Sequence, residues 1–423
     1  MQQEHRKMVP SVTVLFWIVC GCALALYLTI AALLLQKVDL YTFNLPWAIS
    51  GARDGVFSIY CDPSVDYPPL YLALLSCFGA PLSSLASVDF WPGMMLLLKF
   101  WPVFFEVALA VVIFYLLRNE SLLLALLGGV LWLLNPSIAT NSVWWGQTDA
   151  LLCFALLLTF WFFYRRRPEL ALIFFALGCL VKLQMCYFTP IVLCELFFYY
   201  PLKRGLISML AGISIGVAGW LPFMISMKSV SLPFTIYFGG FSKYPYTHLN
   251  AANLYGLTTV AGTPADNSMV GGITFAQMST VVLVLAIAAV CLWYLVSKRT
   301  GIRVEAVVVA MLYSNVLFLF TTAQHERYQI PVMLLAFLWY LISPRISTLI
   351  LYLSLTAITF FNQAFVLLFA NYGGVFDLIL QKSIPVLSVC NLLLFCLMVV
   401  LVLRACLISF EDNMNKGKSN HPK

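Results

Sequence analysis

Charged residues are scarce in this chain of 423 residues. Asp, Glu, Lys and Arg together make up 10% of the sequence, whereas hydrophobic residues make up 62%. Soluble globular proteins carry about 25% charged residues, and one chain of this length has too little interior to bury such an excess of apolar side chains. The composition therefore excludes a water-soluble enzyme, a disordered protein and a nucleic-acid-binding protein, and it predicts a membrane protein.

Common signatures of metal and nucleotide sites are also missing from the sequence. It has no Cys-x-x-Cys pair, no Cys and His cluster with zinc spacing and no glycine-rich phosphate loop. Most of the 12 cysteines lie within apolar runs, where cysteine serves as a small core residue. We expect no cofactor; a divalent metal stays an alternative without a clear ligand set.

Apolar runs long enough to cross a bilayer recur along the whole chain. A spanning helix needs about 20 apolar residues. The predicted segments, some of them short, are 12–35, 98–117, 121–138, 150–164, 168–183, 185–200, 205–226, 276–297, 303–322, 328–343, 346–369 and 383–404. This pattern predicts an all-α polytopic membrane protein with about twelve transmembrane helices, forming a single domain over residues 1–423.

The distribution of basic residues predicts the orientation of the spans. Lys and Arg concentrate in cytoplasmic connections, and most of the 24 such residues fall on one side if the N-terminus is cytoplasmic. Both termini, including a tail at 405–423, are then cytoplasmic. Two large loops, 36–97 and 227–275, fall on the extracytoplasmic side, where we expect the functional site.

Two aspartates distinguish the first large loop. Asp39 follows the first span at headgroup depth, where it is either a water-facing charge at a helix end or a general base between a lipid headgroup and a water-borne acceptor. Asp66 precedes Pro68 and Pro69, which stiffen the backbone. It either lies at a rigid turn of the site or caps an apolar segment at about 70–80, which we expect to lie in the interface.

The third outer element holds Trp145, Gln147 and Asp149. Tryptophan at a membrane surface is commonly an anchor, and Asp149 fits an N-cap of the next span. The turn nevertheless holds more hydrogen-bonding groups than an anchor needs. Lys182 ends a short span on the same side, where a lysine is costly and so marks a functional candidate.

Two further outer segments carry polar motifs. Asn250 and Asn253 lie in an aromatic-rich stretch that suits sugar binding and equally suits any interfacial loop. The strongest motif places His325, Glu326 and Arg327 in a row between two apolar runs. The guanidinium matches phosphate oxygens, and the alternative is a Glu–Arg pair that satisfies itself.

In this order the motifs resemble those of bacterial membrane glycosyltransferases of the GT-C class, related to the second GPI-anchor mannosyltransferase (PIG-V type). The resemblance covers about residues 12–330. Gln324 departs from it, because relatives often have Met before the His. The last three spans carry no motif.

The resemblance implies a GT-C fold in a bacterial plasma membrane. It implies transfer of a hexose, with a mannose-like sugar favoured, from a polyprenyl-phosphate-linked donor to a glycan or glycolipid acceptor of the cell envelope. Asp39 matches the general base and Asp66 a second acidic position. Arg327 and His325 match donor-phosphate contacts, to which we add Lys182. The expected acceptor and sugar contacts are Gln147, Asp149, Trp145, Asn250, Asn253, Glu326 and Tyr328.

The chief alternative is a transporter or flippase of lipid-linked glycans, or a polysaccharide polymerase. Transporters place polar groups near the middle of the membrane. The only clearly intramembrane acids, Glu106 and Glu195, are expected near the ends of their spans. That expectation favours the transferase.

Overall fold

The computed structural model describes residues 2–36, 38–267, 269–302 and 304–419. Lys37 and Ser268 of the two predicted loops, Arg303 of the predicted span 303–322, and residues 420–423 of the predicted tail lie outside the described residues. The chain divides into two compact units. The N-terminal unit comprises Met1–Ala155, Leu180–Lys182 and Ala218–Phe238, and the C-terminal unit comprises Leu156–Cys179, Leu183–Val217 and Gly239–Lys423. The single-domain prediction stays a prediction.

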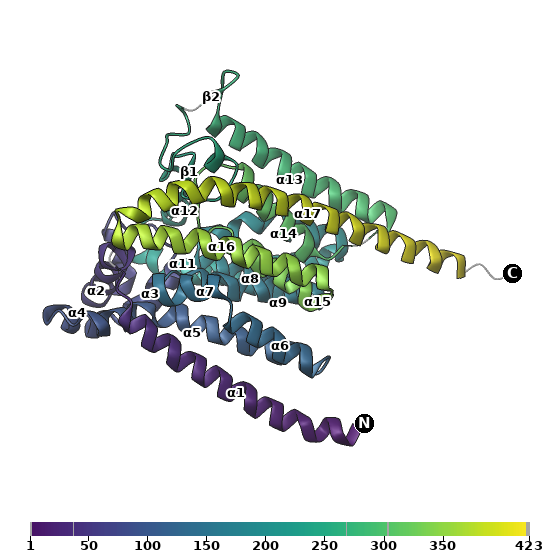
Figure 1. The fold of residues 1–423 in the computed structure, drawn as a ribbon, viewed down its shortest axis with the longest axis horizontal. Helices are drawn as coiled ribbons and strands as arrows, with labels where there is room; N and C mark the ends of the chain where they lie inside the picture. The colour runs from purple at the N-terminus through teal and green to yellow at the C-terminus, as the bar shows by residue number, and fades with distance from the viewer. Residues whose placement is uncertain (1, 37, 268, 303, 420–423) are drawn as a thin grey trace. The chain divides into compact units, whose positions relative to one another are not determined.

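The first part of the chain is almost entirely helical (Figure 1). Its elements are α1 (Gln2–Leu33), the π-helix η1 (Leu40–Asn44), α2 (Leu45–Arg53), the 3-10 helix η2 (Val56–Cys61), α3 (Pro69–Ser76), α4 (Gly79–Ser87), α5 (Trp91–Leu117), α6 (Leu122–Leu133), α7 (Pro136–Ala139) and the π-helix η3 (Thr140–Trp145). In the N-terminal unit, α5 packs against both α1 and α6.

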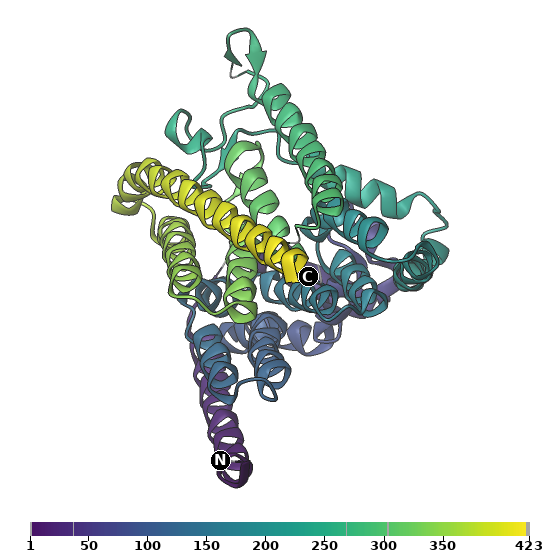
Figure 2. The same cartoon turned by 90° about the vertical axis from the view of Figure 1, so that its right-hand side faces the viewer.

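The middle and last parts of the chain are helical too, and their described residues include four very short strands. The elements are α8 (Asp149–Tyr164), α9 (Pro168–Val181), η4 (Leu183–Phe188), α10 (Thr189–Tyr199), α11 (Leu202–Ser226), α12 (Leu232–Ser242), β1 (His248–Leu249), η5 (Tyr255–Leu257), β2 (Met269–Val270), β3 (Ile273–Thr274), α13 (Phe275–Thr300), α14 (Ala306–Phe320), β4 (Gln324–His325), α15 (Ile330–Ile342), α16 (Ile346–Tyr372) and α17 (Val375–Ser419). In the C-terminal unit α16 and α17 lie side by side (Figure 1), and the β2–β3 hairpin leads into α13 (Figure 2).

Local signals in the sequence explain where several helices begin and end. Ser121 caps α6, since its side chain accepts a hydrogen bond from the backbone N–H of Leu124. Thr274 and Gln277 form a reciprocal capping box at the start of α13. The same helix ends at Gly301, whose φ of 71° is a left-handed conformation that glycine adopts at low cost.

The structure confirms a helical, multi-pass membrane protein. Each of the twelve predicted apolar segments contains helix. Among the described residues, seven helices are long and apolar enough to cross a membrane, or up to eight if the bent α3–α4 pair counts as one span. The shorter apolar helices, which lie at 149–164, 168–181, 183–199, 306–320 and 330–342, have 10–17 residues. The number twelve and the GT-C fold therefore stay predictions.

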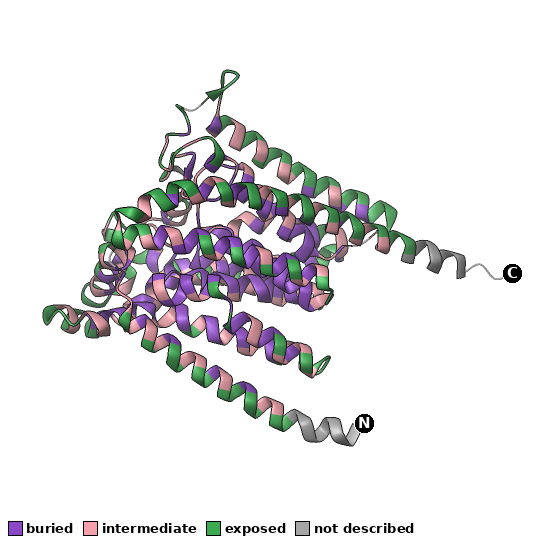
Figure 3. Cartoon of the chain, viewed as in Figure 1, coloured by how far each residue is buried: buried purple, intermediate pink, exposed green. Residues whose placement is uncertain are grey.

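Burial differs sharply between the helices of the C-terminal unit (Figure 3). Helix α15 is buried over nearly its whole length, whereas α13 exposes apolar residues such as Val284 and Leu285. A helix that is apolar on all sides is normal in a membrane, where the outer side chains contact lipid. The short α15 is thus a core element of its unit.

The first large loop, 36–97, is more ordered than its sequence suggests. It holds η1, α2, η2, α3 and α4, and α5 already begins at Trp91. The expected interfacial segment at 70–80 corresponds to α3 and α4, which meet at an angle of 55°. Gly79 permits this packing, because a Cβ there would lie 2.1 Å from the backbone oxygen of Ala48 in α2.

One expectation about the spans is wrong. Glu106 does not lie near the end of its span but in the middle of α5, where it is fully buried. The cause is the early start of α5, whose first turn contains Pro92, a residue favoured at helix N-termini. The position of Glu106 therefore no longer argues against a transporter.

Candidate functional site

In the N-terminal unit, two side chains hold one oxygen of Asp39. Trp145 Nε1 donates a hydrogen bond of 2.6 Å and Gln147 Nε2 one of 2.7 Å, both to Asp39 Oδ2. Within the described part of the chain, no other hydrogen bond reaches this carboxylate. Asp39 itself is half-buried, whereas Trp145 and Gln147 are buried. The sequence predicted all three as site residues, and the structure brings them together.

The backbone around Trp145 explains how these donors reach Asp39. Asn135 caps α7 by accepting hydrogen bonds from two backbone N–H groups, and the π-helix η3 follows directly and ends at Trp145. Gly146 then adopts a left-handed φ of 78°. A Cβ on Gly146 would lie 2.8 Å from Lys99 Cγ and 3.1 Å from Leu40 Cδ1, so only glycine fits this crowded turn.

Lys182 and Asp149 form a buried ion pair in the same unit. Lys182 Nζ lies 2.6 Å from Asp149 Oδ1, and the two side chains are 5% and 1% exposed. Asn141 Nδ2 donates to the other carboxylate oxygen of Asp149 at 3.2 Å. Asp149 is the first residue of α8. Both predicted site residues are thus joined to each other.

Asp66 lies half-buried just before α3, among aromatic residues. Tyr60 donates a hydrogen bond to the backbone oxygen of Tyr67, and Tyr67 packs on Tyr71 with ring centroids 5.5 Å apart. Asn44, at the end of η1, donates to the Tyr71 hydroxyl at 2.8 Å. These contacts tie the segment of Asp66 to the helix that begins directly after Asp39.

In the C-terminal unit, a short parallel pairing joins two predicted motifs. Strands β1 and β4 pair so that His248 lies opposite Gln324 and Leu249 opposite His325. Asn250 forms a further bridge to His325. The aromatic-rich loop and the His-Glu-Arg-Tyr turn, which lie far apart in the sequence, are therefore neighbours.

Arg327 and Glu326 form a close pair within that turn. Arg327 Nη1 lies 2.7 Å from Glu326 Oε1, and the side chains are 12% and 2% exposed. The guanidinium also lies over the Tyr328 ring, 5.7 Å from its centroid. His325 Nδ1 is 4.0 Å from Glu326 Oε2, and the His325 ring packs edge-on against Tyr244. The turn is thus held by its own side chains.

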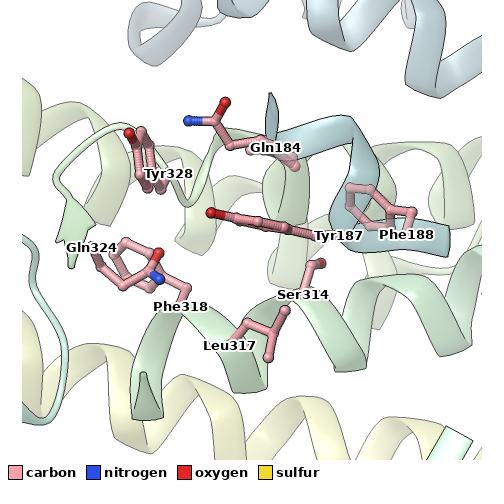
Figure 4. A pocket seen from close by; sticks show the side chains of 9 residues that line it. Gln184, Tyr187, Phe188, Ser314, Leu317, Phe318, Gln324 and Tyr328 are labelled. Atoms are coloured by element: carbon pink, nitrogen blue, oxygen red, sulfur yellow. The ribbon is translucent and has the colours of Figure 1, made fainter. Parts of the chain in front are cut away.

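A small cavity lies beside the His-Glu-Arg-Tyr turn (Figure 4). Its volume is ≈ 20 Å³, enough for about one water molecule and not for a sugar ring. The residues that line it come from η4, α14, the turn and the start of α15: Gln184, Tyr187, Phe188, Ser314, Leu317, Phe318, Gln324, Tyr328 and Pro331. It mixes aromatic rings with amide groups.

Buried amides in the last helices hold the aromatic-rich loop, although no motif was found in those helices. Asn362 of α16 accepts a hydrogen bond from the Ala252 N–H and donates to the Asn250 carbonyl. Asn391 of α17 donates to the Ala252 carbonyl and accepts from Gln329 Nε2. A buried amide in an apolar span was the available signal, since such groups are costly unless bonded.

Asn253 has a structural place in the same loop. Its Oδ1 accepts hydrogen bonds from the N–H groups of Tyr255 and Gly256, and its Nδ2 donates to the Phe318 carbonyl. The neighbouring His248 is buried, with its Nε2 3.2 Å from the Thr259 carbonyl, and burial lowers the pKa of the imidazole. The loop is therefore held by fixed, mainly neutral groups.

No family model matches the sequence, and no curated protein matches it. Within the described residues, no three His, Cys, Asp or Glu side chains are grouped so that they could hold a metal ion. The site must consequently be interpreted from its own geometry. Asp39, Asp66, Asp149 and Lys182 belong to the N-terminal unit, whereas Arg327 and its neighbours belong to the C-terminal unit.

Proposed function

We propose that the protein is an inverting membrane glycosyltransferase. It transfers a hexose, with a mannose-like sugar favoured, from a polyprenyl-phosphate-linked donor to an extracytoplasmic glycan or glycolipid acceptor of the cell envelope. The proposal combines the resemblance of the ordered motifs to GT-C mannosyltransferases with the arrangement of Asp39. A polytopic membrane protein suits a donor that is attached to the bilayer.

The single observation that carries the proposal is the fixed carboxylate of Asp39. Trp145 and Gln147 both donate to Oδ2, which leaves Oδ1 to accept the hydroxyl proton of the acceptor. A general base that is held in place accelerates such a step by about 10²–10⁴. Its position next to the end of α1, in a half-exposed setting, suits an acceptor that approaches from water.

The donor needs a group that stabilises negative charge on the departing phosphate. A polyprenyl phosphate is a good leaving group, so no general acid is required, and preorganised cationic donors lower the barrier. We assign this role to Arg327 and His325. A guanidinium has five N–H donors, so one part of Arg327 can pair with Glu326 while another contacts the phosphate.

The remaining predicted residues have three kinds of role in this proposal: an alternative base, contacts to the sugar, and support of the loop. Asp66 is the second acidic residue and the alternative base. Asn250, next to His325 in the paired loop, and Tyr328, at the small cavity, are the proposed sugar contacts of the C-terminal unit. Asn253 shapes the loop through its backbone hydrogen bonds and is not proposed to touch the sugar.

Donor screening with purified protein tests the proposal. The protein is incubated with a short-chain glycan acceptor and with polyprenyl-phosphate mannose, polyprenyl-phosphate glucose or the matching nucleotide sugars. We expect release of polyprenyl phosphate and a glycosylated acceptor from a lipid-linked donor, with inverted anomeric configuration. Transfer from nucleotide sugars alone, or retention of configuration, would contradict the proposal.

A transporter of lipid-linked glycans is the second candidate, because Glu106 is buried in the middle of α5. An acid at such a depth is characteristic of proteins that move ions or protons. Proteoliposomes separate the two functions. A transporter moves a labelled lipid-linked glycan between leaflets with its sugar–phosphate bond intact, whereas the proposed transferase breaks that bond.

A further inference from the structure

We propose that Lys182 is a positioning residue for Asp39, acting through Asp149 and Asn141, and does not contact the donor phosphate. This inference rests on the proposed function, because it takes Asp39 as the general base. It replaces the expectation from the sequence that Lys182 binds phosphate. The inference is based on a series of hydrogen-bonded residues within the N-terminal unit that leads from Lys182 to Asp39 Oδ2.

The first link is the ion pair between Lys182 and Asp149. Its ammonium lies 2.6 Å from Asp149 Oδ1, and both side chains are almost fully buried. A buried carboxylate attracts a buried ammonium strongly, and removing either partner leaves the other as an uncompensated buried charge. Because Lys182 is only 5% exposed, a donor phosphate would have to enter this buried pair to reach it, and displacing Asp149 would leave an unpaired buried charge.

The second link transmits the position of Asp149 to the turn. Asn141 Nδ2 donates to Asp149 Oδ2 at 3.2 Å, so the carboxylate joins Lys182 to Asn141. The backbone carbonyl of Asn141 accepts the N–H of Gln147 at 3.0 Å. Asn141 lies within η3 and Gln147 follows the end of this π-helix. Asn141 therefore connects the ion pair to the residues at both ends of the turn.

The third link consists of the two hydrogen bonds that orient the carboxylate of Asp39. Trp145 and Gln147 flank Gly146, and both donate to Asp39 Oδ2. Lys99 and Leu40 pack so closely on Gly146 that no side chain fits there. π-Helical turns of this kind occur frequently at functional sites. A displacement of Asn141 should therefore change the direction in which the two donors point.

The chemistry explains why this direction matters for turnover. The O–H bond of the acceptor breaks and its proton passes to Asp39 Oδ1, while the acceptor oxygen forms a bond to the anomeric carbon. The bond from that carbon to the phosphate oxygen breaks, and the phosphate leaves with the electron pair. Two donors on Oδ2 keep Oδ1 facing the acceptor, and misplacement of a catalytic group by about 1 Å costs roughly 10²-fold in rate.

Kinetics of three variants, Lys182→Met, Asp149→Asn and the double variant, test the positioning role. The assay uses the full-length protein in lipid nanodiscs with the lipid-linked sugar. Each single variant should lose about ten- to a hundredfold in kcat with the donor KM nearly unchanged. The double variant should regain thermal stability, because no buried charge is left unpaired, and should keep the low kcat.

Two kinetic results would overturn the inference. If Lys182→Met raises the KM for the donor and the double variant shows the same rise, Lys182 contacts the donor phosphate. Recovery of both stability and kcat in the double variant would make the pair purely structural. Arg204→Met is the matched control, because it breaks the more exposed pair with Glu169 in the C-terminal unit, and exposed pairs contribute little.

A measurement without substrate separates this inference from the proposed function. The indole ¹H–¹⁵N resonance of Trp145, assigned with Trp145→Phe, reports its hydrogen bond to Asp39. Asp39→Asn provides the reference for the weakened bond. Lys182→Met should move the resonance toward that reference even if the protein transfers no sugar. An unchanged resonance in Lys182→Met would contradict the positioning role whatever the protein catalyses.

Discussion

The indole of Trp145 and the side-chain amide of Gln147 donate to the same oxygen of Asp39, at 2.6 and 2.7 Å. Hydrogen bonds to a charged acceptor are short and comparatively strong. Because both donors use Oδ2, the carboxylate has one held oxygen and one that faces away from them. This asymmetry is what distinguishes the site from a surface aspartate at a helix end.

Replacing the two donors should lower turnover without abolishing it. Trp145→Phe and Gln147→Leu each remove one hydrogen bond to a charged group, worth about 1.5–3 kcal/mol, so we expect a loss of roughly ten- to a hundredfold in kcat. The double variant should lose no more than Asp39→Asn, since all three changes act on one carboxylate. Trp144→Phe is the matched control on the neighbouring indole. Equal losses for Trp144→Phe and Trp145→Phe would make the effect one of membrane anchoring.

Arg327→Lys should be nearly as damaging as Arg327→Ala. Lysine keeps the charge but loses the planar fork that contacts two phosphate oxygens. We expect a weaker affinity for the lipid-linked donor and a lower kcat, measured on folded, purified protein. Arg53→Lys serves as a control, because Arg53 pairs with Asp54 on an exposed surface.

The close contact of Arg327 with Glu326 supports a rival account, in which the pair is structural. That account predicts that Glu326→Gln combined with Arg327→Gln restores expression and activity together. Our account predicts that the double variant folds better than Arg327→Gln alone but still binds the donor weakly.

Acid should destabilise the loop that contains His248. Burial lowers the pKa of this imidazole, so the unfolded state takes up the proton first. The contribution of neutral His248 to the stability of the folded state is complete above the ordinary histidine pKa of about 6.5. It is lost as the pH falls through the lowered pKa of the folded state. Thermal unfolding in detergent should show this loss for wild type and a smaller one for His248→Asn. The same loss in both proteins would assign the effect to another group.

Glu106→Gln distinguishes a transferase from a proton-coupled transporter. Glutamine keeps the size of the side chain, but it cannot release a proton. Under the transferase account, sugar transfer by Glu106→Gln should stay near the wild-type rate. Movement of an intact lipid-linked glycan by wild type that is lost in folded Glu106→Gln would favour coupled transport, and Glu106→Ala shows how much the volume of the side chain contributes.

The helices could be predicted from the sequence, because apolar runs long enough for spans are a local signal. All twelve predicted segments are helical, and the ends of several follow from local caps such as Ser121 and Thr274. Within 36–97 only the segment at about 70–80 was expected, and η1, α2 and η2 were missed. They are short and depend on close packing, as at Gly79 against Ala48.

Individual site residues could also be predicted from the sequence, whereas the residues to which they are hydrogen-bonded could not. Asp39, Trp145 and Gln147 were all candidates, but the hydrogen bonds join residues more than a hundred positions apart. The pairing of Lys182 with Asp149 needed the same long-range information. Asn362 and Asn391 carry no motif, and only the fold shows that they hold the aromatic-rich loop.

Transfer by wild type and by Asp39→Asn, measured side by side, tests the central claim most directly. The purified proteins receive polyprenyl-phosphate mannose labelled in the sugar, and the label in the acceptor is followed together with released polyprenyl phosphate. The account predicts transfer by wild type and a loss of at least about a hundredfold for Asp39→Asn, with donor binding retained. Near-normal transfer by Asp39→Asn, with activity lost instead in Asp66→Asn, would contradict it and move the base to Asp66.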